Sequence, residues 1–348
     1  MYEDVWLKLI KPLFSPLLPN EKFFWIYIGS AIVIAAAICW RRLPADERNL
    51  DGLVKAVLPR AVFLHPSALL DYRLVVLNHL LITLVLGYVF VSTIVIAKLV
   101  AAGLTDLAPG LGGWGEAGLW ASAVFTVVAL IAYDFANFFA HWMQHKVPFL
   151  WEFHKVHHSA EVLTPVTASR VHPFGEVFSG TVIATIIGVV DGVFLFLYQG
   201  RIAEMTIYGV NGAFFLYYTI DAYHLKHSHV WVMFPRGCRA VFSSPALHLI
   251  HHSANPKHFD KNMGFIFTVW DRIAGTFYQP SDDERHTMSY GLGPEEQHEF
   301  RSLKGVYWTP VRNVLRDYCG VKLQDEPATS QGPASNGSDH AKAPAPGS

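Results

Sequence analysis

The composition is that of a membrane protein. Of 348 residues, 52% are hydrophobic and 16% are charged, whereas about a quarter of the residues of an ordinary soluble domain carry a charge. A net charge of −1 and the lack of any basic run in the sequence argue against nucleic acid as a partner. The three cysteines are scattered and odd in number, so they predict neither a disulfide framework nor a CxxC site.

Five apolar segments are candidates to cross a bilayer, whose hydrocarbon core needs about 17 to 25 apolar residues as a helix. The first follows an N-terminal segment, 1–22, that has no pattern of a cleavable signal peptide. The last two are separated by a short turn, so they form either a hairpin of full spans or a shallower re-entrant pair. The predicted spans are 23–40, 74–97, 117–133, 177–198 and 205–223.

The lysines and arginines of the loops predict the orientation, because these residues concentrate on the cytoplasmic side. The segment 41–73 holds six of them, and the loop 103–116 holds none. We therefore expect 41–73, 134–176 and the region from 224 onwards to face the cytoplasm. The chain is then a multi-pass integral membrane protein, expected in the inner membrane of a bacterium.

Histidine is the most informative residue of the chain. Imidazole is the commonest transition-metal ligand in proteins, and residues three and four apart lie on one face of a helix. The chain has eighteen histidines, and within little more than a hundred residues ten of them form an HxxxH box, two HxxHH boxes and two single positions. These ten are His141, His145, His154, His157, His158, His172, His227, His248, His251 and His252.

The number of imidazoles favours two metal ions. One tetrahedral zinc uses four ligands, and structural zinc often includes thiolate, which is missing near these boxes. Two metals sharing ten histidines have about five each and keep room for an exogenous ligand. Such a site suits oxygen chemistry at a pair of irons, but nitrogen ligation alone is also compatible with zinc, copper or nickel.

Two other metal-site interpretations fit the sequence poorly. A zinc protease of the HExxH type needs a glutamate after its first histidine, where this chain has Trp142. A membrane haem uses one or two axial histidines within the spans. His79 is the one candidate for that role, and it leaves the boxes unexplained.

The sequence resembles the fatty acid hydroxylase / sterol desaturase superfamily of integral-membrane di-iron oxygenases, over roughly residues 60–280. The combination of the boxes in this order with the trailing WDRxxGTF is specific, whereas a single HxxHH is not. The matching segments are HWMQHKVPFLWEFHKVHHS (141–159), ASRVHPF (168–174), HSHVW (227–231), SPALHLIHHSANP (244–256) and DKNMGFIFTVWDRIAGTFY (260–278).

The resemblance implies that all ten histidines ligate metal, with His172 as the tenth. The sequence departs from the common pattern of the family in two places. Trp142 stands where an arginine is usual, and three histidines lie around position 227 where many members have fewer, so His224 or His229 could share or replace the role of His227. Asp134, two helical turns before the first box, is either an acceptor for a ligand's ring N–H or a polar residue at the membrane edge. Asp260, Asn262 and Asp271 are expected to fix the fold beneath the last box, and His258, His286 and His298 to lie on the surface.

The resemblance further implies two iron ions with O₂ as co-substrate, and hydroxylation or desaturation of a lipid such as a fatty acyl chain or sterol. No catalytic residue beyond the metal ligands is expected. The sequence has no nucleotide fingerprint and no iron–sulfur cysteine cluster, so we expect a separate electron donor of ferredoxin or cytochrome type. The alternative is a non-enzymatic, His-rich membrane protein that handles or transports metal.

Together these features predict an all-α fold: a membrane helical bundle of about four to five spans, with a cytoplasmic helical cap that carries the histidine boxes. By range, the expected parts are an N-terminal segment (1–22), transmembrane helices (23–133), a histidine-box di-iron oxygenase domain with two further membrane helices at 177–223 (134–320), and a disordered tail (321–348).

Overall fold

The computed structural model describes residues 10–12, 14–84, 91–198, 202–220 and 223–321. The tail from residue 322 onwards, with His340, and the short turn at 199–201 lie outside the described residues. The described chain is mostly helical, which confirms the all-α prediction. Its one sheet has two short antiparallel strands, β1 (Thr206–Ile207) and β2 (Val210–Asn211).

Four helices of the described chain are long and apolar enough to cross a membrane, which confirms an integral membrane helical bundle. Their outer faces are rich in exposed large hydrophobic side chains, as expected of helices that contact lipid. These helices are α2 (Trp25–Arg42), α5 (Pro66–Leu84), α7 (Leu119–Lys146) and α9 (Pro173–Tyr198).

The predicted span at 74–97 is wrong. Helix α5 begins earlier, at Pro66, and ends at Leu84, and a separate helix, α6 (Thr93–Leu107), follows; residues 85–90 lie outside the described residues. The prediction began after the charged residues Asp71 and Arg73. Asp71, however, lies inside the helix, fully buried and paired with Arg170, so its charge does not end the helix.

The predicted span at 205–223 is also wrong. Here β1 and β2 form a hairpin that leads into a helix of nine residues, α10 (Gly212–Ile220); residues 221–222 lie outside the described residues. Tyr208 and Gly209 adopt left-handed backbone angles, φ 52° and 77°, as the two central residues of a tight hairpin turn require. The Asn211 side chain then accepts from the Ala213 amide, which begins the helix. Apolar composition alone does not reveal such a turn.

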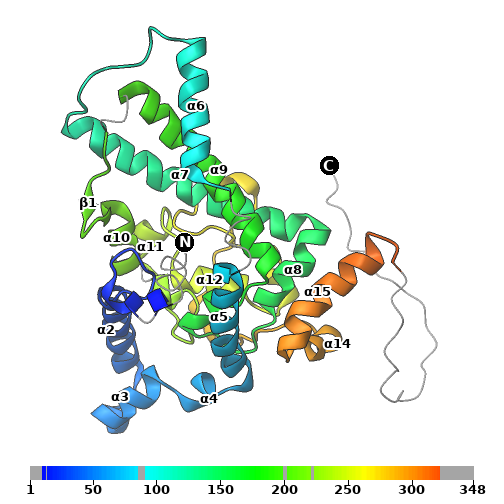
Figure 1. The fold of residues 1–348 in the computed structure, drawn as a ribbon. Coiled ribbons are helices and arrows are strands. Elements are labelled where there is room, and N and C mark those ends of the chain that lie inside the picture. The colour runs from blue at the N-terminus through cyan, green and yellow to red at the C-terminus, as the bar shows by residue number, and fades with distance from the viewer. Residues whose placement is uncertain (1–9, 13, 85–90, 199–201, 221–222, 322–348) are drawn as a thin grey trace.

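Helices α6, α7 and α9 lie side by side at one end of the molecule (Figure 1). Two glycines on α9, Gly188 and Gly192, allow α6 to approach closely. A Cβ atom added at Gly188 would lie 2.6 Å from the Ile96 Cβ, and one added at Gly192 would lie 2.6 Å from the Val100 Cβ. Small residues four apart are a recurrent means of bringing two membrane helices into backbone contact.

The other helices are short and surround the ends of the long ones. Helix α8 follows α7 directly after the Val147 C-cap, and α15 packs against α8. These helices are α3 (Leu50–Val57), α4 (Arg60–Phe63), α8 (Pro148–His158), α11 (Arg236–Arg239), α12 (Pro245–His251), α13 (Val269–Ala274), α14 (Pro294–Gln297) and α15 (Leu303–Asp317).

A buried ion pair fastens α5 to the connection between α8 and α9. The Arg170 Nη1 atom lies 2.7 Å from the Asp71 Oδ1 atom, and both side chains are almost fully buried. The same guanidinium donates to the Ser159 hydroxyl and to the carbonyls of Val156 and Phe300. With its donors satisfied in this way, the charge is stable in the interior and fixes the backbone that flanks His157 and His158.

The contact between α6 and α9 gives a first prediction. In Gly192→Leu the new side chain would overlap Val100, so the two helices must separate; overpacking of this kind costs about 1–3 kcal/mol. We expect a lower thermal unfolding midpoint in detergent. Gly103→Leu on α6 is the matched control, because nothing lies within 4 Å of its added Cβ. Equal midpoints for the two variants would contradict the close contact.

Candidate metal centre

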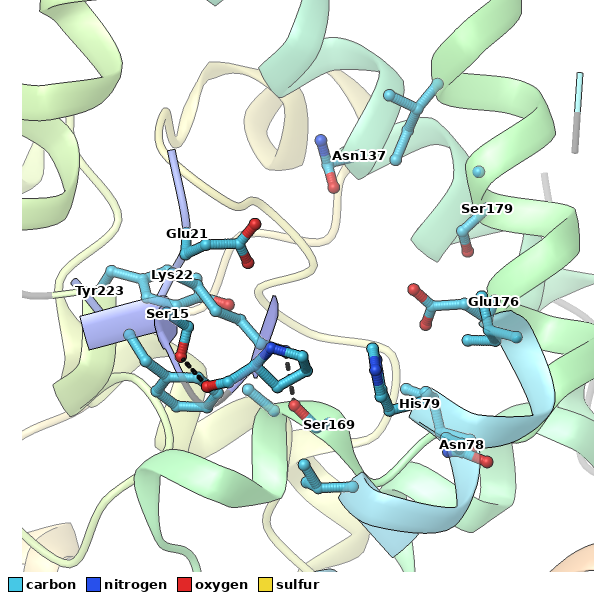
Figure 2. Close-up of a pocket in the computed structure, with 18 of the residues that line it drawn as sticks. Ser15, Glu21, Lys22, Asn78, His79, Asn137, Ser169, Glu176, Ser179 and Tyr223 are labelled. Atoms are coloured by element: carbon cyan, nitrogen blue, oxygen red, sulfur yellow. Dashed lines mark hydrogen bonds between the residues drawn. The ribbon is translucent and has the colours of Figure 1, made fainter. Parts of the chain in front are cut away.

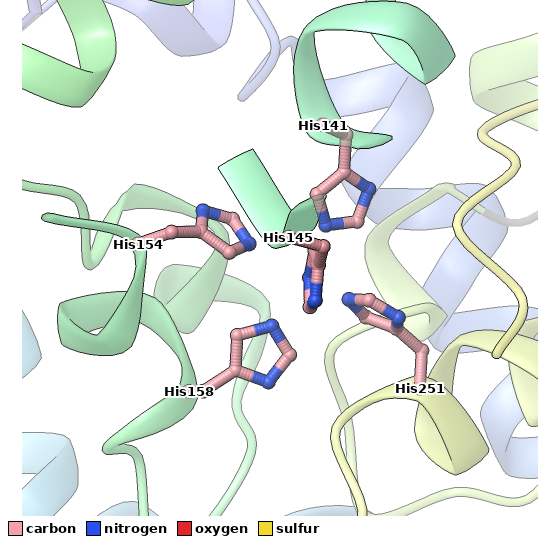
Figure 3. A group of neighbouring side chains, drawn as sticks. All are labelled: His141, His145, His154, His158 and His251. Carbon is pink, nitrogen blue, oxygen red and sulfur yellow. The ribbon is translucent and has the colours of Figure 1, made fainter. Parts of the chain in front are cut away.

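Nine of the ten candidate histidines form two adjacent groups. The first group consists of His141, His145, His154, His158 and His251 (Figure 3), and the second of His157, His227, His248 and His252. Within each group, one nitrogen from every ring lies within 4.8 Å of the corresponding nitrogens of the others. Seven of the nine residues are buried, and His141 and His145 are half-buried.

Helical spacing explains how the boxes divide between the groups. Residues four apart share a helix face, so His154 and His158 of α8 enter the first group while His157 turns to the second. At the end of α12 the division is reversed, since His248 and His252 enter the second group and His251 the first. Each HxxHH box therefore contributes to both groups, and this couples the two sites.

Backbone carbonyls fix the tautomers of two rings in the first group. The His141 Nδ1–H donates to the Met263 carbonyl at 3.0 Å, and the His251 Nδ1–H donates to the Lys261 carbonyl at 2.9 Å. A carbonyl only accepts, so Nδ1 must carry the proton and Nε2 keeps its lone pair. The His145 Nδ1 atom lies 3.4 Å from the Asp260 carboxylate, which orients that ring in the same way.

The inward nitrogens of this group have no hydrogen-bond partner. The Nε2 atoms of His145, His154, His158 and His251 are buried and unpaired among the described residues. A buried polar atom without a partner costs about 1–3 kcal/mol. Figure 3 shows the five rings directed toward a common space. Converging lone pairs in such a space fit a metal ion.

In the second group the inward nitrogens face one another at contact distance. The Nε2 atom of His227 lies 3.1 Å from that of His157, 2.9 Å from that of His248 and 3.1 Å from that of His252. A single Nε2 atom cannot hydrogen-bond to three others of its kind at once. With metal–nitrogen bonds of about 2.1 Å, neighbouring ligands lie about 3.0–3.4 Å apart, which matches this spacing.

Burial keeps these imidazoles neutral. It lowers the pKa of His157 to about 4, and it lowers the pKa values of His154, His158, His248 and His252 well below the ordinary value for histidine, with neighbouring histidines adding to the effect. Only the neutral ring binds a metal. The interior thus holds the ligands in their binding form at neutral pH.

The tenth candidate, His172, lies outside both groups. Its Nε2–H donates to the Tyr307 carbonyl at 3.2 Å, and its Nδ1 accepts from the Phe174 amide at 3.1 Å. Both nitrogens therefore have partners, as in a residue that supports the start of α9. We leave His172 out of the proposed ligand set.

The choice among three neighbouring histidines falls on His227. The His224 ring donates to the Lys22 carbonyl at 2.7 Å and the His229 ring to the Ala56 carbonyl at 2.9 Å, both away from the metal groups. The prediction that His258 lies on the surface is wrong, because this residue is only 2% exposed. It packs on the Tyr278 ring beside Glu284.

Carboxylates hold the loop that carries the backbone acceptors. Among the described residues, Asp134 accepts from no histidine. It accepts from the Ile266 and Phe267 amides at 2.6 and 3.1 Å and from the Trp270 indole at 2.7 Å, which fastens the loop to α7. Asp271 accepts from the Met263 and Gly264 amides at 2.8 and 2.7 Å. Asn262 donates to the Leu247 carbonyl of α12, so Asn262 and Asp271 support the last box as expected, whereas the Asp260 carboxylate contacts His145 and Lys146 of α7.

A cavity adjoins the histidines. A pocket of about 160 Å³ is lined by His141, His154, His157, His227 and His248. It shares part of its lining, including Asn137, Glu176 and Ser179, with a larger cavity of about 820 Å³ between α5 and α9 (Figure 2). The large cavity and the pocket at the histidine groups are therefore adjacent.

The comparisons with known proteins point to one family. The family model "Fatty acid hydroxylase" matches residues 126–276, which include all nine grouped histidines. No solved structure matches the chain. The family match thus rests on the sequence that forms the two histidine groups.

Three relatives illustrate the likeness. The chain is 28% identical to alkylglycerol monooxygenase of Caenorhabditis elegans over 51% of this chain and 31% of that protein. It is 28% identical to ornithine lipid hydroxylase OlsE of Rhizobium tropici over 46% of this chain and 44% of that protein. It is 24% identical to sphinganine C4-monooxygenase 1 of Arabidopsis thaliana over 49% of this chain and 60% of that protein. The matches thus span from about a third to three fifths of these relatives. Together with the family match and the two histidine groups, they place residues 126–276 of the chain in the fatty acid hydroxylase / sterol desaturase superfamily.

Proposed function

We propose that this chain is a membrane-bound di-iron oxygenase that uses O₂ and two electrons to hydroxylate a lipid. The observation that carries the proposal is the pair of histidine groups, whose inward nitrogens converge beside a cavity between two candidate membrane helices. The three relatives described above are all monooxygenases or hydroxylases of lipids, which supports hydroxylation over desaturation.

The first group would hold one iron through His141, His145, His154, His158 and His251, and the second group the other through His157, His227, His248 and His252. When bound, the iron pair supplies the activation of O₂. The overall reaction inserts one oxygen atom into a C–H bond, and the other oxygen leaves as water with two protons and two electrons from a donor.

The residues of the chain orient the ligand rings, position the substrate and exclude water. The carbonyls of Lys261 and Met263 and the Asp260 carboxylate hold three rings in the tautomer that directs Nε2 inward. The small pocket brings one carbon of the substrate against His157, His227 and His248 and leaves little room for water. Control of ligand geometry and of the reacting carbon is the expected contribution of the protein in such an enzyme.

The electron donor is proposed to be a separate ferredoxin- or cytochrome-type protein that docks on the cytoplasmic side. The six lysines and arginines at 41–73 support this sidedness. A metal-handling transporter is less well supported. Transporters place their sites near the bilayer midplane on broken spans. Of the nine grouped histidines, only His141 and His145 lie on a candidate membrane span, helix α7, and they lie in its last two turns.

Neighbouring residues in the last box give a sharp test of two metal sites. His251→Ala should remove one metal ion from the first group, and His252→Ala one from the second, because adjacent residues serve different groups. We expect metal analysis of the purified variants to find about half the iron of the unsubstituted protein in each case. His172→Ala is the matched control and should keep all of it, since both of its ring nitrogens have backbone partners. Full iron retention in both box variants would refute the ligand assignment.

The reaction is tested in the lipids of a host cell that expresses the chain. Mass spectrometry should show a lipid that gains one oxygen atom with the intact protein and not with His251→Ala. A lipid that instead loses two hydrogen atoms would mean desaturation. Unchanged lipids, in cells where the protein retains its iron and a suitable donor is present, would contradict an oxygenase.

The lowered histidine pKa values predict acid sensitivity of the metal-free protein. The pKa of His157 falls from an ordinary 6.5 to about 4 on folding. Between pH 4 and pH 6.5, His157 is therefore protonated in the unfolded chain and neutral in the folded chain. Stability is therefore full above about pH 6.5 and declines as the pH falls toward 4; at about 1.4 kcal/mol per pH unit, His157 alone accounts for roughly 3 kcal/mol. Thermal unfolding of chelator-treated protein from pH 7.5 to pH 4 measures this decline, and a flat profile would contradict it.

A further inference from the structure

The large cavity is more polar than a site for a plain acyl chain requires. It lies between α5 and α9, and the N-terminal segment closes one side of it with Lys11, Ser15, Glu21 and Lys22 (Figure 2). This segment lies outside the region that the family model matches, 126–276. The polar side of the cavity is thus partly a feature of this chain rather than of the matched domain.

Lys22 is a positive charge that the protein does not neutralise by contact. Its Nζ atom donates to the Ser169 hydroxyl at 2.5 Å, and no carboxylate of the described residues lies within 4 Å of it. Lys11, beside it, is paired with Glu21 at 2.5 Å. Burial lowers the pKa of Lys22, and the negative charges of Glu176 and Glu21 oppose that change. An anionic group of a ligand would complete its surroundings.

Glu176 is a matching negative charge on the other side of the cavity. It lies in the first turn of α9, and Figure 2 shows its carboxylate directed into the cavity, with His79 nearby. No cation of the described residues forms an ion pair with it. The His79 Nε2 atom is buried without a hydrogen-bond partner, and Asn137 and Ser179 add further polar groups to the lining. These groups suit a ligand with hydrogen-bond donors.

We infer that the cavity binds a zwitterionic lipid headgroup, with its anionic group on Lys22 and its ammonium group on Glu176. This inference deepens the proposed function, on which it rests for the role of the lipid as substrate. Opposite charges on the two walls, each without an ion-pair partner, complement a headgroup that carries both signs. A purely anionic head would face Glu176, and a neutral one would leave Lys22 unpaired.

The position of the cavity also indicates where the lipid is oxidised. The small pocket at the second histidine group shares Glu176, Ser179 and Asn137 with the headgroup cavity. A headgroup held there places the adjoining carbons, rather than the far end of an acyl chain, against the metal groups. Oxidation is therefore expected in the headgroup or within the first carbons of the chain.

The test compares three single-chain probes that share a myristoyl tail: lysophosphatidylethanolamine, lysophosphatidylglycerol and monoacylglycerol. Native mass spectrometry of the full chain in a neutral detergent gives the dissociation constant of each. The protein should bind the zwitterionic phosphatidylethanolamine probe most tightly, by about tenfold or more, since hydrogen bonds to charged groups contribute at this level.

Two variants separate the two charges. Lys22→Met should weaken binding of the zwitterionic and anionic probes about tenfold and leave the neutral probe unchanged. Glu176→Gln should weaken the zwitterionic probe but not the anionic one, from which a repulsive charge is removed. Lys55→Met and Glu47→Gln are the matched controls, because both residues are exposed and lie outside the cavity. Equal binding of all probes, or variants that bind as the unsubstituted protein does, would overturn the inference.

The same titration on chelator-treated protein separates this inference from the proposed function. Selective binding that persists after chelation would support the headgroup site independently of the metal. If the untreated protein also holds no iron and oxidises no lipid, the oxygenase is refuted while the headgroup site stands. Iron binding and lipid oxidation without headgroup selectivity would do the reverse.

Discussion

The structure depends on the burial of converging, neutral imidazole nitrogens. Four inward Nε2 atoms of the first group have no partner among the described residues, and those of the second group lie about 3 Å apart. Without a shared ion each unpaired nitrogen costs about 1–3 kcal/mol. Helix ends, loop carbonyls and buried carboxylates hold these nitrogens in place, and a metal ion bound by each group would offset this cost.

Several long-range polar contacts support that arrangement. Arg170 and Asp71 join α5 to the backbone beside His157 and His158. Asp134 and Asp271 hold the loop whose carbonyls orient His141 and His251. Each of these buried charges has several hydrogen-bond partners, so its removal would leave unpaired groups next to the metal groups.

Much of the site could be predicted from the sequence because helical spacing is local. The i, i+4 rule brings His141 to His145, His154 to His158 and His248 to His252. The exclusion of His172 could not be predicted, because its partner, the Tyr307 carbonyl, lies 135 residues away. The two wrong span predictions, at 74–97 and 205–223, also depend on features that local composition does not show. The first depends on a charge, Asp71, that pairs with a distant residue, and the second on a turn set by backbone angles.

The division between matched and unmatched sequence also bears on specificity. The histidines lie within residues 126–276, where the family model matches. The charged side chains of the large cavity come from separate parts of the chain, with Lys22 before α2 and Glu176 on α9, while His79 lies on α5. Lys22 and His79 lie outside the matched region, whereas Glu176 lies within it. The proposed headgroup site would therefore join a side chain of the matched region to side chains that precede it in the sequence.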